Sequence, residues 1–280
     1  MRQTGYFLPQ SIYLCIKQAA LGNRKIHFPL RSLALFLHNM LTKTEALVLR
    51  HIKYGDNRMI VDLFTRECGR MSFAVTVSRG GRGGVRRQTL SPLTLIEAEC
   101  DISRRTKLQK LRSVRLAMPL PSLSTDPRKL SIAMFLAEFL CYALRDEQQG
   151  DRLFDYIADC LQWLDGRGEG YANFHLVFLM RLSRFLGFFP NLDGYRPGCC
   201  FDLRSGCFSD SLPPHRDVLL PQEASLIRLM MRMNFATMHL FRMSHTERNR
   251  MVEVIIQYYR IHIPGFPELR SLAVLRELFV

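Results

Sequence analysis

The chain reads TEALVLRHI at residues 44–52, MIVDLFT at 59–65 and MSFAVTV at 71–77, and these three stretches decide the fold. Each is short and rich in β-branched, aromatic and aliphatic residues, which favour strands. Turn-forming residues separate them, YGDN at 54–57 and CG at 68–69. The pattern predicts three successive strands joined by tight turns.

Two more strands are predicted downstream, at residues 93–100 (LTLIEAEC) and 108–116 (LQKLRSVRL). No segment with a helical period lies between the five strands that is long enough to connect parallel neighbours. The pattern therefore favours a small five-stranded barrel over a parallel sheet.

From residue 119 onward the apolar residues follow a helical period. Asp126 and Pro127 form a helix start, with Asp as the N-cap and Pro at the first helical position. Ser244 and Glu247 form a capping box that opens another helix. An irregular stretch containing cysteines is expected at 190–214. Beyond the helix that starts at Pro127, helices are predicted at residues 153–164, 174–186, 223–233, 248–263 and 271–278.

The sequence thus divides into an extension at 1–40, a barrel domain at 41–118 and a helical domain at 119–280, which together predict an α+β protein. The extension contains no Asp or Glu and shows no steady period, and a strand pattern begins directly after Met40. Met40 is therefore interpreted as the true start of translation. A basic DNA-binding arm is the rival interpretation of the extension.

The positive charge of the chain is concentrated near its start. The formal net charge is +14, with five Lys/Arg and no acid in residues 1–40, sixteen against seven in 41–118, and eighteen of each in 119–280. A basic domain fused to a neutral one indicates that only the first contacts a polyanion such as nucleic acid. A generally basic surface is the alternative.

The candidate phosphate-binding residues form two strings. The loop at 78–87 (SRGGRGGVRR) interleaves arginine with glycine, so that the backbone approaches a phosphate closely and guanidinium groups bind its oxygens. A flexible solvated loop is the alternative interpretation. The first string comprises Arg79, Arg82, Arg86 and Arg87, and the second comprises Arg104, Arg105, Lys107, Lys110 and Arg112.

Zinc is a second, weaker hypothesis, and its candidate ligands are Cys199, Cys200, Cys207 and His215. A structural zinc site needs four ligands, usually as two chelating pairs. Because adjacent cysteines point in different directions, Cys199 and Cys200 are poorly placed to bind one ion together. Free thiols are the default interpretation, and no cofactor is expected.

No catalytic motif is present, and the protein is expected not to be an enzyme. A metal-dependent nuclease using Glu97, Glu99 and Asp101 is an alternative, with exposed strand carboxylates as the simpler interpretation. An RNA-binding barrel is another alternative, since fold alone does not choose between nucleic acids.

Eight cysteines are scattered without the pattern of a disulfide framework, and no uncharged apolar run reaches the roughly 20 residues that span a bilayer. A cytoplasmic, nucleoid-associated protein is the expectation.

Several runs, in this order, resemble the bacterial RecO family of DNA repair proteins. The resemblance covers residues 41–280. It rests on residues 55–70 (GDNRMIVDLFTRECGR) for the family's GE…LFTRExGK signature, 77–80 (VSRG) for its KGARK loop, 89–93 (TLSPL) for LQPF, 185–192 (FLGFFPNL) for LGYxPxL and 271–275 (SLAVL) for LKSLxVL.

The resemblance implies an OB-fold at the N-terminus and a helical domain with a zinc-finger-like insert. It implies binding of single- and double-stranded DNA, strand annealing, and loading of RecA with RecR in the RecFOR pathway of DNA repair and recombination. It also implies that the helical domain binds the acidic tail of single-strand-binding protein. Two departures stand out: three cysteines replace the family's four zinc ligands, and arginine and glycine replace its loop lysines.

Overall fold

A computed structural model describes residues 40–77, 85–103, 106–145 and 150–278 of the chain. The extension predicted at 1–40 lies outside these residues apart from Met40, where the first strand begins. No helix in the described part of the chain is both long enough and apolar enough to cross a membrane.

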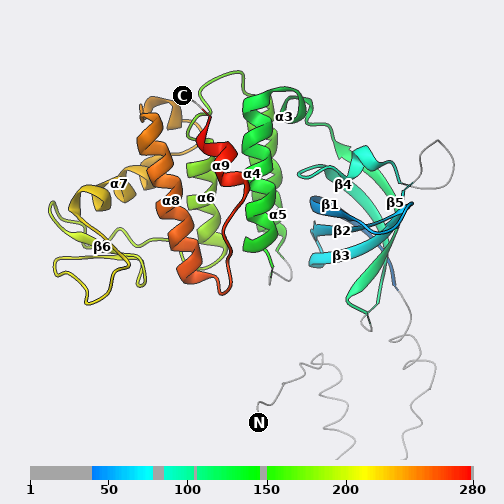
Figure 1. Cartoon of the computed structure of the whole chain (residues 1–280), viewed down its shortest axis with the longest axis horizontal. Coiled ribbons are helices and arrows are strands. Elements are labelled where there is room, and N and C mark those ends of the chain that lie inside the picture. Colours follow the sequence, from blue (N-terminus) through cyan, green and yellow to red (C-terminus); the bar gives the residue numbers. More distant parts are fainter. Residues whose placement is uncertain (1–39, 78–84, 104–105, 146–149, 279–280) are drawn as a thin grey trace, which may run out of the picture. The chain divides into compact units, whose positions relative to one another are not determined.

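The N-terminal part forms a closed, OB-like barrel of five strands (Figure 1). Their order around the barrel is β1-β2-β3-β5-β4, and every neighbouring pair is antiparallel except β3 and β5. The five-stranded barrel predicted from the sequence is confirmed. The strands are β1 (Met40–Lys53), β2 (Arg58–Thr65), β3 (Gly69–Thr76), β4 (Leu95–Ile102) and β5 (Leu108–Met118).

Side chains of the barrel strands serve two different cores. Because successive residues of a strand face opposite sides, Ala46 and Val48 lie in the barrel interior with Phe73. Leu47 and Leu49 lie on the outer face, where they join the core of the helices. The outer face of β1 is therefore covered by the helical part at this level.

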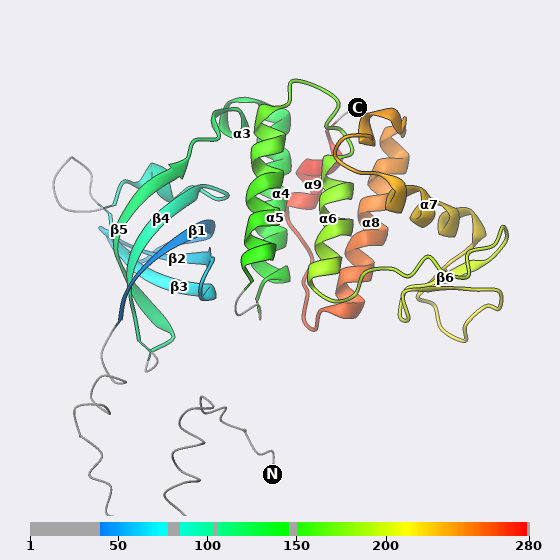
Figure 2. The ribbon, with the colours of Figure 1, turned by 180° about the vertical axis from the view of Figure 1, so that it is seen from behind.

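The C-terminal part is helical, with α4 and α5 nearest the barrel and α7 and β6 farthest from it (Figures 1 and 2). A short 3-10 turn at Met238–Leu240 adds to these helices, and another, at Arg87–Leu90, lies between β3 and β4 of the barrel. The helices are α3 (Pro121–Thr125), α4 (Pro127–Ala143), α5 (Asp151–Gly166), α6 (Phe174–Phe185), α7 (Pro221–Arg232), α8 (His245–His262) and α9 (Ser271–Arg276).

Both predicted helix starts are confirmed. The Asp126 side chain accepts hydrogen bonds from the backbone N–H groups of Arg128 and Lys129, directly before Pro127. Ser244 and Glu247 form a complete capping box at the start of α8. These caps satisfy N–H groups that have no partner inside the helix.

The stretch at 190–214, which was predicted to be irregular, is only partly irregular, because it contains two short strands. A three-stranded sheet of order β7-β6-β8 is built from β6 (Cys200–Asp202), β7 (Cys207–Ser209) and β8 (Val218–Leu219). Strands of two or three residues are too short to show an alternating pattern, which is why the sequence did not reveal them.

One carboxylate joins the barrel to α4. Asp62 lies on the outer face of β2 but is only 4% exposed. Its carboxylate accepts hydrogen bonds from Arg50 Nε at 2.6 Å, from Arg70 at 3.1 Å and from the Ser72 hydroxyl. Arg70 also donates to the carbonyl of Cys141 in α4, at 2.6 Å.

A second contact lies beside the first. Arg66 donates to Glu45 in the barrel at 2.8 Å and to Asp155 in α5 at 2.6 Å. Its guanidinium also stacks over the ring of Phe154, 4.5 Å from the centroid. The two arginine bridges fix the side of the barrel that faces the helices.

Replacing Asp62 with Asn should lower the free energy of unfolding by about 1–3 kcal/mol, because Arg50 and Arg70 lose their buried carboxylate partner. Burial works to raise the pKa of Asp62, but the hydrogen bonds from Ser72 and Arg50 hold it below its ordinary value. A carboxylate with a lowered pKa stabilises the fold above its unfolded-state value and loses that contribution as the pH falls through the folded-state pKa.

The difference in urea denaturation between wild type and Asp62→Asn should therefore be full at pH 7 and shrink below about pH 4. Asp56→Asn, in an exposed turn, is the matched control and should change nothing. An equal loss of unfolding free energy at all pH values would show that Asp62 acts through packing rather than charge.

Candidate nucleic-acid interface

Part of the first basic string lies at the end of the barrel. Arg86 and Arg87 follow Val85 and are both exposed. Neither forms an ion pair with any described residue. Arg79 and Arg82 lie outside the described residues. Two guanidinium groups are thus open to a phosphate at the point where the chain leaves the glycine-rich segment.

The second string follows the outer face of β5. Lys110 and Arg112 are exposed and alternate with the buried Gln109 and Leu111, and Lys107 is exposed just before the strand. Arg104 and Arg105 lie outside the described residues. The cations of β5 therefore project from the barrel and away from its interior.

Arg112 differs from its neighbours because it already has a partner. Its Nε lies 2.8 and 2.7 Å from the two carboxylate oxygens of Asp101 on β4. The hydrogen bond and charge of Asp101 raise the pKa of Arg112. Lys107 and Lys110, which form no ion pair within the described residues, are the freer cations of this string.

Strand β3 brings the two strings near each other. Ala74 pairs with Lys110 of β5, and Val77, three residues farther on, pairs with Val85. At about 3.3 Å per residue, Lys110 and Val85, which directly precedes Arg86, are separated by roughly 10 Å along β3 and the residue that follows it. This spacing lets one nucleic-acid backbone contact both strings.

Lys53 and Arg58 also belong to this end of the barrel, although the sequence analysis did not single them out. They flank the turn between β1 and β2, both are exposed, and neither has an ion-pair partner among the described residues. Basic residues on both sides of a predicted hairpin turn are the sequence signal that indicates them.

Two of the three carboxylates of the alternative nuclease site are paired with cations, and the third, Glu97, is exposed on β4. Glu99 lies 2.9 Å from Lys43 Nζ and accepts a hydrogen bond from Ser113, and Asp101 is held by Arg112. Within residues 85–103 and 106–145, no group of three or more His, Cys, Asp or Glu side chains is placed to hold a metal ion. The structure gives the nuclease hypothesis no support.

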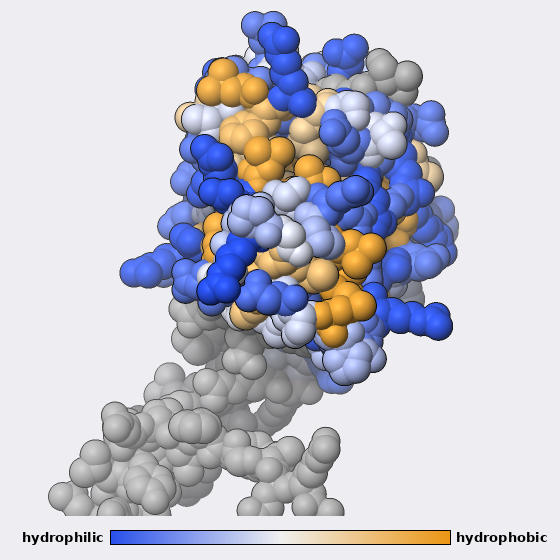
Figure 3. Space-filling model, turned by 90° about the vertical axis from the view of Figure 1, so that its left-hand side faces the viewer, coloured by the Kyte–Doolittle hydropathy of each residue, from blue (hydrophilic) through white to orange (hydrophobic). Residues whose placement is uncertain are grey.

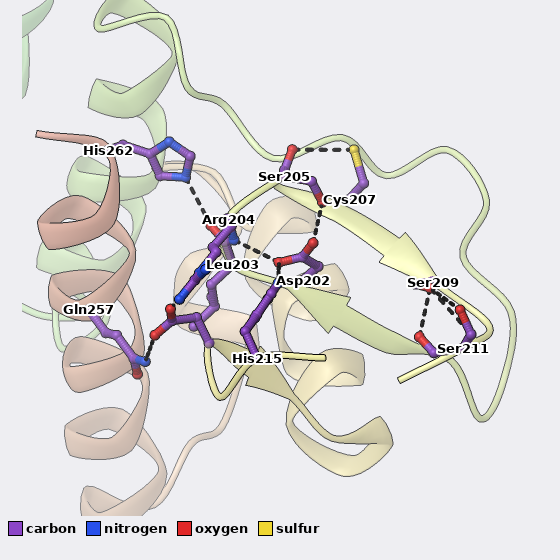
Figure 4. Close-up of polar contacts among 11 residues, drawn as sticks. Asp202, Leu203, Arg204, Ser205, Cys207, Ser209, Ser211, His215, Gln257 and His262 are labelled. Carbon is purple, nitrogen blue, oxygen red and sulfur yellow. Dashed lines mark hydrogen bonds and ion pairs between the residues drawn. The ribbon is translucent and has the colours of Figure 1, made fainter. Parts of the chain in front are cut away.

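The candidate zinc ligands do not converge. Cys199 is buried, whereas Cys200 begins β6 and is half-buried. Cys207 Sγ donates to the carbonyl oxygen of Ser205 at 3.4 Å, and His215 Nε2 lies 3.4 Å from an oxygen of Asp202 (Figure 4). Within residues 150–278 no group of three or more potential metal ligands is found, so these residues do not fit a tetrahedral zinc site.

In place of a metal ion, the carboxylate of Asp202 joins several polar groups of the segment that contains β6, β7 and β8, called the insert below. The carboxylate accepts hydrogen bonds from the backbone N–H of Arg204 and from the Ser205 hydroxyl, at 2.8 and 2.9 Å (Figure 4). Burial works to raise its pKa, but these hydrogen bonds and His215 hold it below its ordinary value. The turn between β6 and β7 is therefore held by a carboxylate.

The surface near the insert differs from the basic end of the barrel. Figure 3 views the side on which β6 and α7 lie and shows apolar side chains reaching the surface between hydrophilic ones. Leu212 and Leu220, on either side of β8, are among the exposed apolar residues. Scattered apolar groups of this kind give no phosphate-binding surface.

Comparison with known proteins gives consistent matches along the whole described chain. The family description "Recombination protein O N terminal" matches residues 40–120, and "Recombination protein O C terminal" matches residues 124–273. The chain is 49% identical over 240 residues to the DNA repair protein RecO of Phocaeicola vulgatus, 46% over 241 residues to that of Bacteroides fragilis and 32% over 241 residues to that of Christiangramia forsetii. Each alignment covers 86% of this chain and 100% of the relative.

Protein purified from zinc-containing medium should carry far less than one zinc per chain, and Cys200→Ser combined with Cys207→Ser should leave Tm unchanged. Asp202→Ala should lower Tm by about 2–4 °C, because the turn loses hydrogen bonds together worth about 1 kcal/mol. Elemental analysis and thermal unfolding measure both effects. If the wild-type protein carried one zinc per chain and the double cysteine variant carried none, the conclusion that these residues do not form a zinc site would be wrong.

Proposed function

Because the chain belongs to the RecO family, whose members are non-enzymatic recombination mediators in DNA repair, we propose that its barrel binds DNA phosphates, anneals complementary strands and helps load a recombinase. The observation that carries the proposal is a group of cations on the barrel that are exposed and have no ion-pair partner among the described residues. The group comprises Lys53, Arg58, Arg86, Arg87, Lys107, Lys110 and Arg115.

The position of these cations supports phosphate contacts without base readout. They lie on turns and on the outer face of β5, and no α-helix that could enter a major groove is found within the described residues of the barrel. Binding of this kind depends on charge and is nearly independent of sequence. That property suits a protein that must act on any broken or gapped DNA.

Annealing follows from the same charges. Two complementary strands repel each other through their phosphates, and a surface that neutralises both backbones lets the bases meet. On this proposal the barrel neutralises the strands, and no bond in the DNA is made or broken.

The partners implied by the family resemblance are RecR and the acidic tail of single-strand-binding protein, and we propose a place for the tail. A groove of about 320 Å³ lies between α5, α6 and α7. Arg181 and Arg184 line it together with Phe185. Its methionines, which adapt to a bound side chain, are Met180, Met230, Met231 and Met233.

Charge and apolar character together select the occupant of this groove. Arg184 stacks over the ring of Phe189, 4.4 Å from the centroid, and Arg181 donates to the carbonyl of Met233. Both arginines are exposed, so they attract carboxylates while the methionines take an apolar side chain. An acidic peptide with an apolar residue fits both features. Binding of the tail of single-strand-binding protein in this groove would bring the protein to DNA in the bacterial nucleoid, within the cytoplasm.

Replacing Arg86 and Arg87 with Ala should weaken binding of single-stranded DNA at every sequence tested and slow strand annealing in the presence and absence of single-strand-binding protein. If each arginine neutralises one phosphate, the slope of log K against log salt should fall in magnitude by about 1.4 for single strands. Fluorescence anisotropy across a salt series measures the slope.

Arg216→Ala with Arg242→Ala removes the same charge from the exposed surface of the helical part and is the matched control. Wild-type binding that does not change with salt would refute the phosphate mechanism. A matched RNA strand that binds far more tightly than DNA would favour the RNA-binding alternative.

Replacing Arg181 and Arg184 with Glu should weaken binding of a peptide that carries the last residues of the host single-strand-binding protein by about tenfold or more, because like charges then face each other. Isothermal titration calorimetry measures the affinity, and Arg216→Glu serves as the control. Unchanged peptide affinity with an unchanged fold would place the tail elsewhere.

A further inference from the structure

Tyr54 is an exposed aromatic residue on an otherwise charged part of the barrel. It lies in the turn between β1 and β2 and is 63% exposed. Among the described residues the other exposed aromatic side chain is Phe185, at 39%. The remaining described phenylalanine, tyrosine and tryptophan side chains are buried or half-buried, so Tyr54 requires a separate explanation.

The turn holds the backbone of Tyr54 in place. Its N–H donates to the carbonyl of Arg58 at 2.9 Å, which closes the hairpin. Gly55, the next residue, has a φ of +82°, a conformation that glycine adopts without steric cost. A ring carried by a closed turn loses less conformational freedom on binding than one carried by a loose loop.

The same turn lies beside the start of the basic segment. Val77 donates its N–H to the carbonyl of Asn57 at 2.8 Å, and Val77 pairs with Val85. Val85, which directly precedes Arg86, and the turn that carries Tyr54 are therefore neighbours at one end of the barrel. Both are joined to the end of β3.

Cations lie near Tyr54 along the chain. Lys53 and Arg58 lie on either side of the turn, and Arg86 and Arg87 follow Val85, which pairs with Val77 beside the turn. Asp56 is the acid in the same turn and offsets one of these charges. An exposed aromatic ring among cations is the combination that single-strand-binding barrels use, with bases stacked on the ring and phosphates on the cations.

We propose that Tyr54 stacks against an unpaired base of the DNA strand that the neighbouring cations hold. This inference rests on the proposed DNA-binding function and adds a preference to it. Bases in a duplex are already stacked on each other and offer no free face, whereas bases in a single strand do. Tyr54 therefore contributes to single-strand affinity and leaves duplex affinity to the cations.

Tyr54→Ala should weaken binding of an unstructured single-stranded oligonucleotide at least about fivefold, the lower end of the loss for one stacked base. Affinity for a duplex of the same length should change by less than about twofold. Tyr54→Phe keeps the ring and should bind both DNAs as wild type does. Leu240→Ala, an exposed apolar residue of the helical part, is the matched control.

Tyr54→Trp gives a direct signal, since an indole that stacks on a base loses fluorescence when single-stranded DNA is added. The natural Trp163 packs against Phe174 in the helical core, and its unchanged signal in the wild-type protein serves as the reference. Thermal unfolding of each variant shows that the barrel is intact.

Three results would overturn the inference. Equal losses for single strands and duplexes in Tyr54→Ala would assign Tyr54 to the phosphate-binding surface. No loss for either, with Arg86→Ala and Arg87→Ala still weakening both, would remove Tyr54 from the site and leave the proposed function intact. Failure of the wild-type protein to bind any DNA would refute the proposed function itself.

Discussion

The buried carboxylate of Asp62 is the constraint on which the rest of the structure depends. A carboxylate removed from water is stable only with cations and hydrogen-bond donors around it, and Arg50, Arg70 and Ser72 supply them. Because Arg70 also binds the carbonyl of Cys141, satisfying Asp62 places the outer face of β2 against α4. That face is then closed to nucleic acid, whereas the turns at one end and the β5 side of the barrel are open.

Two sets of arginines on the barrel consequently have different surroundings. Those facing the helices are neutralised by carboxylates, as Arg66 is by Glu45 and Asp155. Those at the open end, such as Arg86 and Arg87, have no such partner among the described residues. The same residue type serves for assembly on one side and for attraction of a polyanion on the other, and local acids decide which.

The fold was largely predictable from the sequence because its strong signals are local. The β-rich run at residues 59–65 and the caps at Asp126 and Ser244 act within a few residues of the chain. The burial of Asp62 and its ion pairs could not be predicted, since its partners come from other strands. The exposure of Tyr54 could not be predicted either, because a tyrosine in a hairpin turn has the same sequence context whether it packs or projects. Those parts of the site exist only through tertiary contacts.

Charge alone would not direct the two proposed ligands, DNA and the acidic protein tail, to different sites. On both proposals, a basic barrel would attract any polyanion, including an acidic protein tail that is proposed to bind the groove between α5, α6 and α7. The groove adds an apolar lining of methionines that a sugar-phosphate chain does not use and that an apolar peptide side chain does. The open end of the barrel adds instead a dense set of cations and one exposed ring. Specificity between the two sites therefore comes from what accompanies the arginines, since both sites contain them.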